Sequence, residues 1–173
     1  MPRSKTTEAV AHHEAGHAVA AWHQHMKFRR VTIVPDKAEG NLGHLKHIRR
    51  KWFNPDFDTG TRTIVLAQSW IVVSLAGQIA EGKFRCRRPR WGMDGDNQNA
   101  VDLAFHLCGS EKTANAYLRY CWCITEDLVN VRWKTIQAVA AALLKNKTLS
   151  YADVIEVIMP GSRELRMSLV AKQ

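Results

Sequence analysis

The sequence lacks several features that would assign it to a common class at once. No uninterrupted apolar stretch approaches the roughly 20 residues that a membrane-spanning helix needs. No apolar run follows the polar N-terminus, as it would in a signal peptide. Internal repeats and low-complexity segments are also missing. We therefore expect a cytoplasmic globular protein, neither secreted nor embedded in a membrane.

Cysteine is scarce, and its spacing matches no common zinc-binding pattern. The four residues are Cys86, Cys108, Cys121 and Cys123. In a helix the last two would project to different faces, so they could not bind one metal ion together. We expect buried free thiols in a reducing compartment rather than disulfides or a zinc finger.

The composition is that of an ordinary soluble protein with an excess of positive charge. Hydrophobic residues make up 46% and charged residues 24% of the 173 positions. This length predicts a single domain over residues 1–173, with a core of about 8–158 and a C-terminal tail, 159–173. The net charge is +9, with basic clusters at 27–30, 46–51 and 83–90. No recognisable nucleic-acid-binding motif accompanies them, so we do not expect nucleic acid as a partner.

Residue periodicity predicts a mainly α protein with a small β-sheet, in the α+β class. Thr6 or Thr7 can cap a first helix that fades by residue 26. The β-branched run 31–34 predicts a strand, and 41–47 a partner strand. A second helix is expected over residues 60–82, where Gly82 ends it, and a third begins at residue 96. A long helix follows from Ser110 to about residue 143. A last, short helix begins at Ser150 and is ended by Pro160.

The motif His13-Glu14-Ala15-Gly16-His17 reads H-E-x-x-H and lies in the first predicted helix. Residues i and i+4 share a helix face, so the two imidazoles can point at one metal ion. Glu14 can reach a water molecule on that metal and act as a general base. Two nitrogen ligands, an open position and a carboxylate are what a zinc peptidase requires. The alternative is an alanine-rich core helix that carries two histidines by chance.

A catalytic zinc ion needs one more protein ligand. The downstream candidates are Glu81, Asp94, Asp96, Asp102, His44, His47 and His106. A carboxylate at the start of a helix, after a glycine-containing loop, is the more plausible geometry. Asp94 and Asp96 both satisfy that condition, and the chemistry alone does not choose between them.

Several stretches together resemble the peptidase domain of the FtsH family, the zinc proteases usually fused to an AAA+ ATPase. They occur in the order of that family and cover roughly residues 8–158. The matching segments are His13–Val19, Val31–Pro35, Leu42–His44, Leu75–Glu81, Gly95–Ala104 and Ala140–Leu149. The first is specific, and the shared order of the others supports it.

The resemblance implies one zinc ion per chain, held by His13, His17 and Asp96. It also implies that Glu81 lies close to the site, where it would orient a ligand histidine through the other ring nitrogen. Leu42, Gly43 and His44 would belong to a substrate-binding strand. An extended peptide can add to such an edge strand through main-chain hydrogen bonds.

The sequence departs from the family in having no Walker motif or other ATPase segment. We therefore expect an ATP-independent zinc endopeptidase that cuts peptides or unfolded protein segments, with a separate ATPase or adaptor as a candidate partner. Two alternatives stay open. One is a catalytically inactive binding or regulatory module, and the other a basic nucleic-acid-associated protein with a structural metal.

Overall fold

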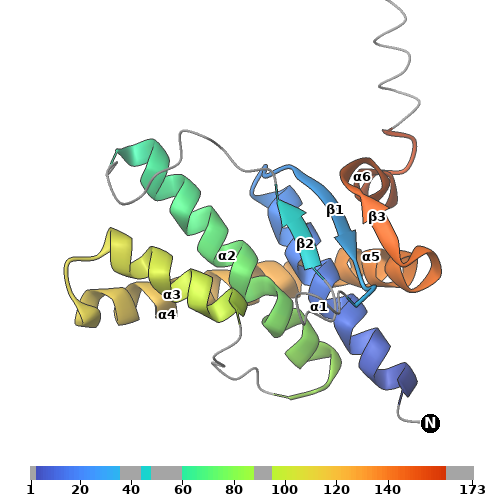
Figure 1. Ribbon diagram of the computed structural model, residues 1–173, viewed down its shortest axis with the longest axis horizontal. Helices are drawn as coiled ribbons and strands as arrows, with labels where there is room; N and C mark the ends of the chain where they lie inside the picture. The colour runs from blue at the N-terminus through green and yellow to red at the C-terminus, as the bar shows by residue number, and fades with distance from the viewer. Residues whose placement is uncertain (1–2, 36–43, 48–59, 88–94, 163–173) are drawn as a thin grey trace, which may run out of the picture.

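The computed structural model describes residues 3–35, 44–47, 60–87 and 95–162. Six helices and three short strands occupy these ranges, which confirms the expected mainly α class with a small antiparallel sheet (Figure 1). The elements, in chain order, are α1 (Arg3–His23), β1 (Phe28–Thr32), β2 (His44–His47), α2 (Thr61–Phe84), α3 (Gly95–Leu107), α4 (Glu111–Val131), α5 (Trp133–Asn146), β3 (Thr148–Ser150) and α6 (Tyr151–Ile158).

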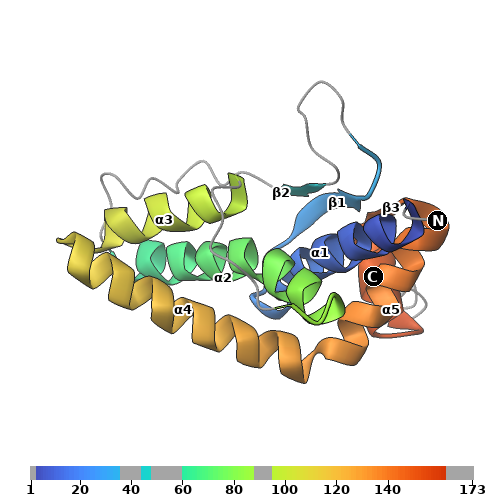
Figure 2. The ribbon, with the colours of Figure 1, turned by 90° about the horizontal axis from the view of Figure 1, so that it is seen from below.

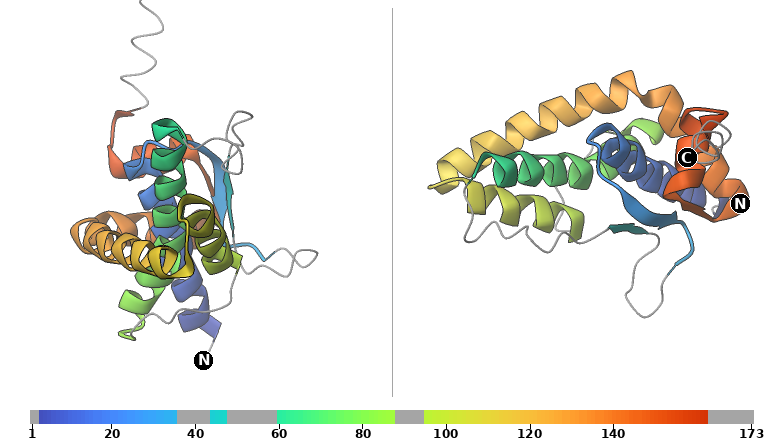
Figure 3. Two further views of the ribbon diagram at one scale, coloured as in Figure 1. Left: turned by 90° about the vertical axis from the view of Figure 1, so that its left-hand side faces the viewer. Right: turned by 90° about the horizontal axis from the view of Figure 1, so that it is seen from above.

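The helices and the sheet form three layers. Helices α1 and α2 make the middle layer, α3 and the sheet cover one side of it, and α4 and α5 cover the other (Figure 2). The two further views in Figure 3 show the same arrangement. Helices α1 and α2 therefore form the centre of the core, and their side chains contact the elements on both sides of them.

Helices α1 and α2 approach each other closely because α1 is built from small residues. A Cβ atom on Gly16 would lie 2.6 Å from the carbonyl oxygen of Ala76 and 2.8 Å from Cβ of Ala80. Ala15, Ala18 and the other central alanines of α1 are fully buried. The glycine thus has a packing reason that offsets its low helix propensity.

Helix α2 is apolar around most of its circumference. Its most apolar window has a mean hydropathy of 1.6, so by length and composition it could cross a membrane. However, 72% of that window is buried inside the protein, against α1, α3 and α4. This is also the pattern of a core helix in a soluble protein.

The sheet has the order β2-β1-β3, and both pairings are antiparallel. Strand β1 begins earlier than the expected 31–34 and ends at Thr32. Beyond it the amide of Ile33 still donates to the carbonyl of Lys147, whereas that of Val34 turns to the hydroxyl of Thr32. The sequence predicted the pairing of β1 with a second strand but not β3. With three residues between two helices, β3 is too short to show a periodicity.

Three further expectations concern helix ends. Ser110 and Ser150 are confirmed as N-caps, each within a reciprocal capping box. The expected single helix from Ser110 to about 143 is wrong, because the chain leaves helical geometry at Arg132 and divides into α4 and α5. Gly82 does not end α2; the amide of Arg85 donates to the carbonyl of Glu81, and the helix runs to Phe84.

The cysteines are free, as expected, but only Cys121 is fully buried. Cys86 and Cys123 are exposed, and Cys108 is intermediate. The expectation of four buried thiols is therefore wrong for the two exposed residues, which lie on outward faces of their segments.

Candidate metal centre

Helix α1 presents His13 and His17 together toward α2. Their Nε2 atoms lie 3.0 Å apart, one helical turn from each other. The side chain of His17 is 6% exposed and that of His13 is 19% exposed. The helical spacing of the motif therefore brings the two ring nitrogens to one point.

Asp96, in the first turn of α3, brings a carboxylate oxygen to the same point. Its Oδ2 atom lies 3.3 Å from Nε2 of His13 and 3.1 Å from Nε2 of His17. The ligand atoms of these three residues all lie within 4.8 Å of one another, and no fourth His, Cys, Asp or Glu of the described residues joins this cluster. A site with three protein ligands leaves a coordination position open, as catalytic zinc sites do.

Gly77 of α2 forms the floor beneath the two imidazoles. A Cβ atom at this position would lie 2.3 Å from Nε2 of His17 and 2.7 Å from Nε2 of His13. Any side chain here would collide with the nitrogens that face the centre. The site therefore requires glycine at position 77, because only a residue without a side chain leaves room for the two imidazoles.

The outer nitrogen of each imidazole has a hydrogen-bond partner. Nδ1 of His17 donates to the backbone carbonyl of Val73, at 2.6 Å, and Nδ1 of His13 donates to Oε2 of Glu81, at 3.2 Å. Both bonds assign the proton to Nδ1 and leave the Nε2 lone pair for a metal ion. The other carboxylate oxygen of Glu81 accepts from Nε of Arg85 at 2.7 Å.

Glu14 is buried beside the cluster. It is 4% exposed, and its Oε2 atom accepts no hydrogen bond from any residue in the described ranges. Burial raises the pKa of its carboxyl, although the charges of His17 and His13 lower it. A buried carboxylate oxygen without a partner, on a side chain that interacts electrostatically with His13, His17 and Asp96, is suited to accept a hydrogen bond from a water molecule.

Proton affinities in the cluster are strongly perturbed when no metal is bound. Burial lowers the pKa of His13, but hydrogen bonds to Asp96 and Glu81 and the charge of Glu14 raise it to about 10. For His17, burial is again opposed by Asp96, and its pKa is raised. Burial raises the pKa of Asp96, but the charge of His17 and hydrogen bonds from both histidines bring it well below its usual range.

The donor set fits a divalent metal ion. Zinc–nitrogen and zinc–oxygen bonds of about 2.0–2.2 Å at tetrahedral angles separate donor atoms by about 3.3–3.6 Å. The three observed separations, 3.0, 3.1 and 3.3 Å, approach that range. Two imidazoles and a carboxylate are also ligand types that zinc accepts readily.

The remaining candidates lie elsewhere or outside the described ranges. Leu42 and Gly43 of the expected substrate strand, and Asp94, lie outside the described residues. His44 and His47 are the first and last residues of β2, which packs near α1. Asp102 and His106 belong to α3 and are not part of the cluster.

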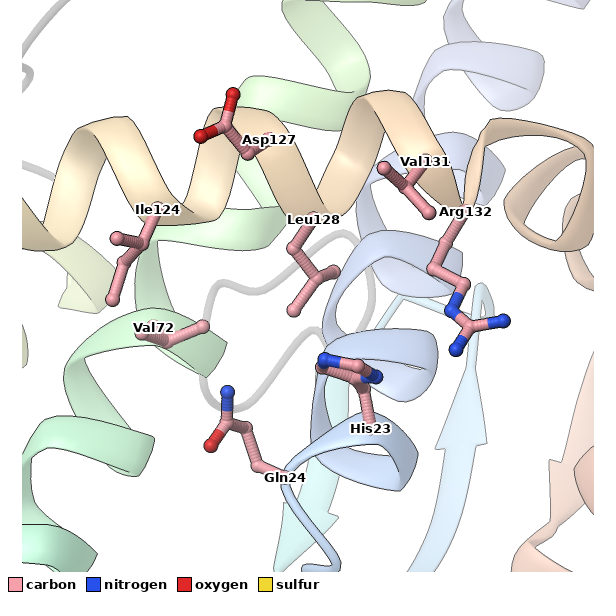
Figure 4. A pocket seen from close by; sticks show the side chains of 8 residues that line it. All are labelled: His23, Gln24, Val72, Ile124, Asp127, Leu128, Val131 and Arg132. Carbon is pink, nitrogen blue, oxygen red and sulfur yellow. The ribbon is translucent and has the colours of Figure 1, made fainter.

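His23 lines a separate hollow on the other side of the middle layer. The hollow has a volume of about 280 Å³ and lies between the end of α1, α2 and α4 (Figure 4). Its mainly apolar lining includes Val72 and Leu128, and the carboxylate of Asp127 points away from His23 (Figure 4). No residue of the metal cluster lines this hollow.

Sequence reasoning missed the carbonyl of Val73, the floor at Gly77 and the partner of Glu81, Arg85. A backbone carbonyl has no sequence signal at all. Gly77 could have been noticed as a glycine inside a helical pattern, which indicates a close approach.

Comparison with protein-family models finds no matching family, and comparison with curated proteins finds no match.

Proposed function

We propose that the protein is a zinc metalloendopeptidase that hydrolyses peptide bonds in peptides or unfolded protein segments. One observation supports this above all others. The ligand atoms of His13, His17 and Asp96 converge, and the buried Glu14, whose carboxylate interacts electrostatically with all three, has one oxygen without a hydrogen-bond partner among the described residues. The proposal places the protein in the FtsH-type peptidase class, as a cytoplasmic enzyme.

In this proposal His13, His17 and Asp96 hold the zinc ion. When bound, zinc supplies Lewis acidity, which lowers the pKa of a water molecule and polarises a peptide carbonyl. Glu81 keeps the His13 ring oriented, and the Val73 carbonyl does the same for His17. Both rings are thus fixed before substrate arrives, which favours a preorganised site.

Glu14 is proposed as the general base. Its carboxylate would accept a proton from the attacking water and return it to the leaving amine. Burial raises the pKa of Glu14, which brings it closer to neutral pH and suits a group that must both take and give a proton. The unpartnered Oε2 atom is the acceptor that this step needs.

Strand β2 is the proposed substrate-binding element. It is the end strand of the sheet as described, so one of its edges has no partner strand within the described ranges. It lies on the same side of the middle layer as α3, which carries Asp96 (Figure 2). An extended peptide could pair with this edge with little dependence on its side chains, which suits an enzyme for unfolded segments.

The test is digestion of casein by the wild-type protein and by the Glu14→Gln variant, with and without a chelator and with and without ATP. We expect cleavage by wild type that needs metal but not ATP, and a loss of at least about 100-fold in the variant with zinc retained. No cleavage by metal-loaded wild type would favour the inactive binding module. DNA or RNA binding that weakens steeply with salt would favour the nucleic-acid alternative.

A further inference from the structure

A pair of amide side chains joins α2 to α3 immediately beside the metal cluster. Nε2 of Gln78 donates to Oδ1 of Asn97, and Nδ2 of Asn97 donates back to Oε1 of Gln78 at 3.2 Å. Asn97 is 2% exposed. In sequence, Gln78 follows the floor residue Gly77, and Asn97 follows the ligand Asp96.

On the buried face of α3 the other fully buried positions carry only small side chains, while the half-buried Val101 and Leu103 pack against the core. Asn97 shares this face with Ala100 and Ala104, at the i, i+3 and i+7 positions, and both alanines are fully buried. Apolar contacts hold the helix against the core but have no angular requirement, so they fix its rotation and axial position less sharply than hydrogen bonds do. A reciprocal amide pair is satisfied in one arrangement only, because hydrogen bonds require both distance and angle.

The position of Asp96 depends on that arrangement. Its carboxylate is 44% exposed and meets His13 and His17 only if the first turn of α3 is held over α2. Burying an amide without its partner is costly, so the pair disfavours other registers of α3. A buried polar pair that selects one register is an established use of such groups in helix packing.

We propose that Gln78 and Asn97 are positioning residues that set the register of α3 on α2 and thereby bring Asp96 to the metal. This inference rests on the proposed metal centre. Neither amide touches the cluster atoms in the hydrogen bonds described above, so both act through the helix that carries Asp96. The pair links α2 at Gln78, next to Gly77, to α3 at Asn97, next to Asp96.

The test is a double-mutant cycle on metal affinity, with Gln78→Ala, Asn97→Ala and both together. Zinc affinity is measured by competition with a chelator, and coordination by the absorption spectrum of the cobalt-substituted protein. We expect each single variant to lose about 10- to 100-fold in affinity, the range for outer-shell partners. We expect the double variant to lose little more than either single one, because the two side chains act as one unit.

Gln98→Ala is the matched control, because it removes an exposed amide from the next position of α3, where Gln98 donates to Asp102. It should leave the affinity and the cobalt spectrum unchanged. Asp96→Ala gives the reference spectrum for a lost carboxylate ligand, and the Asn97 variant should shift toward it.

A lower melting temperature of the metal-free variants with unchanged metal affinity would overturn the inference, since a merely structural pair would behave in that way. Additive losses in the cycle would also overturn it. If Asn97→Ala does not fold, the zinc affinity of Gln78→Ala, a change at a partly exposed position, tests the inference alone. Failure of wild type to bind zinc would instead remove the proposed function itself, so the two failures are distinguishable.

Discussion

Nδ1 of His17 donates a hydrogen bond of 2.6 Å to the backbone carbonyl of Val73. This bond ties the face of α1 that carries His13 and His17 to the main chain of α2, so no side-chain substitution at position 73 removes it. It fixes both the ring orientation and the tautomer of His17. His13 depends instead on the side chain of Glu81, so the two imidazoles should differ in their sensitivity to mutation.

The Glu81→Gln variant tests this difference. An amide oxygen can still accept from Nδ1 of His13, but the negative charge that strengthens this bond is lost. We expect zinc affinity to fall about tenfold, with the fold retained. Arg85→Ala, which leaves the Glu81 carboxylate in place, should have a smaller effect. Equal affinities of wild type and Glu81→Gln would show that the negative charge of Glu81 does not strengthen metal binding through His13.

The Gly77→Ala variant should damage the centre through its shape alone. The added Cβ atom would meet Nε2 of both histidines well inside contact distance, and these rings are held by hydrogen bonds. We expect a loss of roughly 1–3 kcal/mol of stability from overpacking and a loss of zinc binding. Gly109→Ala is the control, because a Cβ atom there meets nothing within 4 Å. Calorimetry and elemental analysis would follow both variants, and normal zinc content in Gly77→Ala would contradict the account.

The Asp96→Ala variant should lose a ligand and thus more affinity than any outer-shell variant, by more than about 100-fold. Asp102→Ala is its matched control, since Asp102 lies on the same helix, is exposed and is not in the cluster. Elemental analysis after dialysis should find about one zinc per chain in the control and little in Asp96→Ala. A normal zinc content in Asp96→Ala would show that the third ligand is a residue other than Asp96.

Zinc affinity should increase with pH. The pKa of His13 in the metal-free protein is raised to about 10, and a metal ion binds only the neutral ring. Below pH 10, each zinc ion must displace at least that proton. The apparent affinity should therefore rise about tenfold or more per pH unit between pH 6 and 9. Chelator competition across this range would check it, and an affinity independent of pH would be inconsistent with the cluster described.

The metal-free protein should show the opposite trend in stability. The pKa of His13 is about 10 when folded and near 6.5 as a free side chain, so its contribution is complete below pH 6.5 and disappears as the pH rises toward 10. The melting temperature without metal should thus be higher at pH 6.5 than at pH 9.5. Scans of wild type and His13→Ala at both values would measure this contribution, because the variant should lose the share of the difference that comes from His13, while the share from His17, whose pKa is also raised, remains.

Local patterns in the sequence were sufficient for the positions of most helices, the strand pair and the capping boxes at Ser110 and Ser150. They were wrong about the start of α1, which begins at Arg3 and not at a cap on Thr6 or Thr7, and about the end of α2. They also indicated the i, i+4 placement of His13 and His17, because that relation lies within one helix. The break at Arg132 has no glycine or proline to reveal it. The floor at Gly77 and the Gln78–Asn97 pair depend on how α1, α2 and α3 meet, which no periodicity encodes.

The separation of the cluster along the chain has a consequence for biosynthesis. Asp96 follows His17 by 79 residues, so the two imidazoles leave the ribosome well before the carboxylate does. A nascent chain at that stage carries two of the three proposed ligands. Under the proposed function, complete coordination of a metal ion would therefore follow the synthesis and docking of α3.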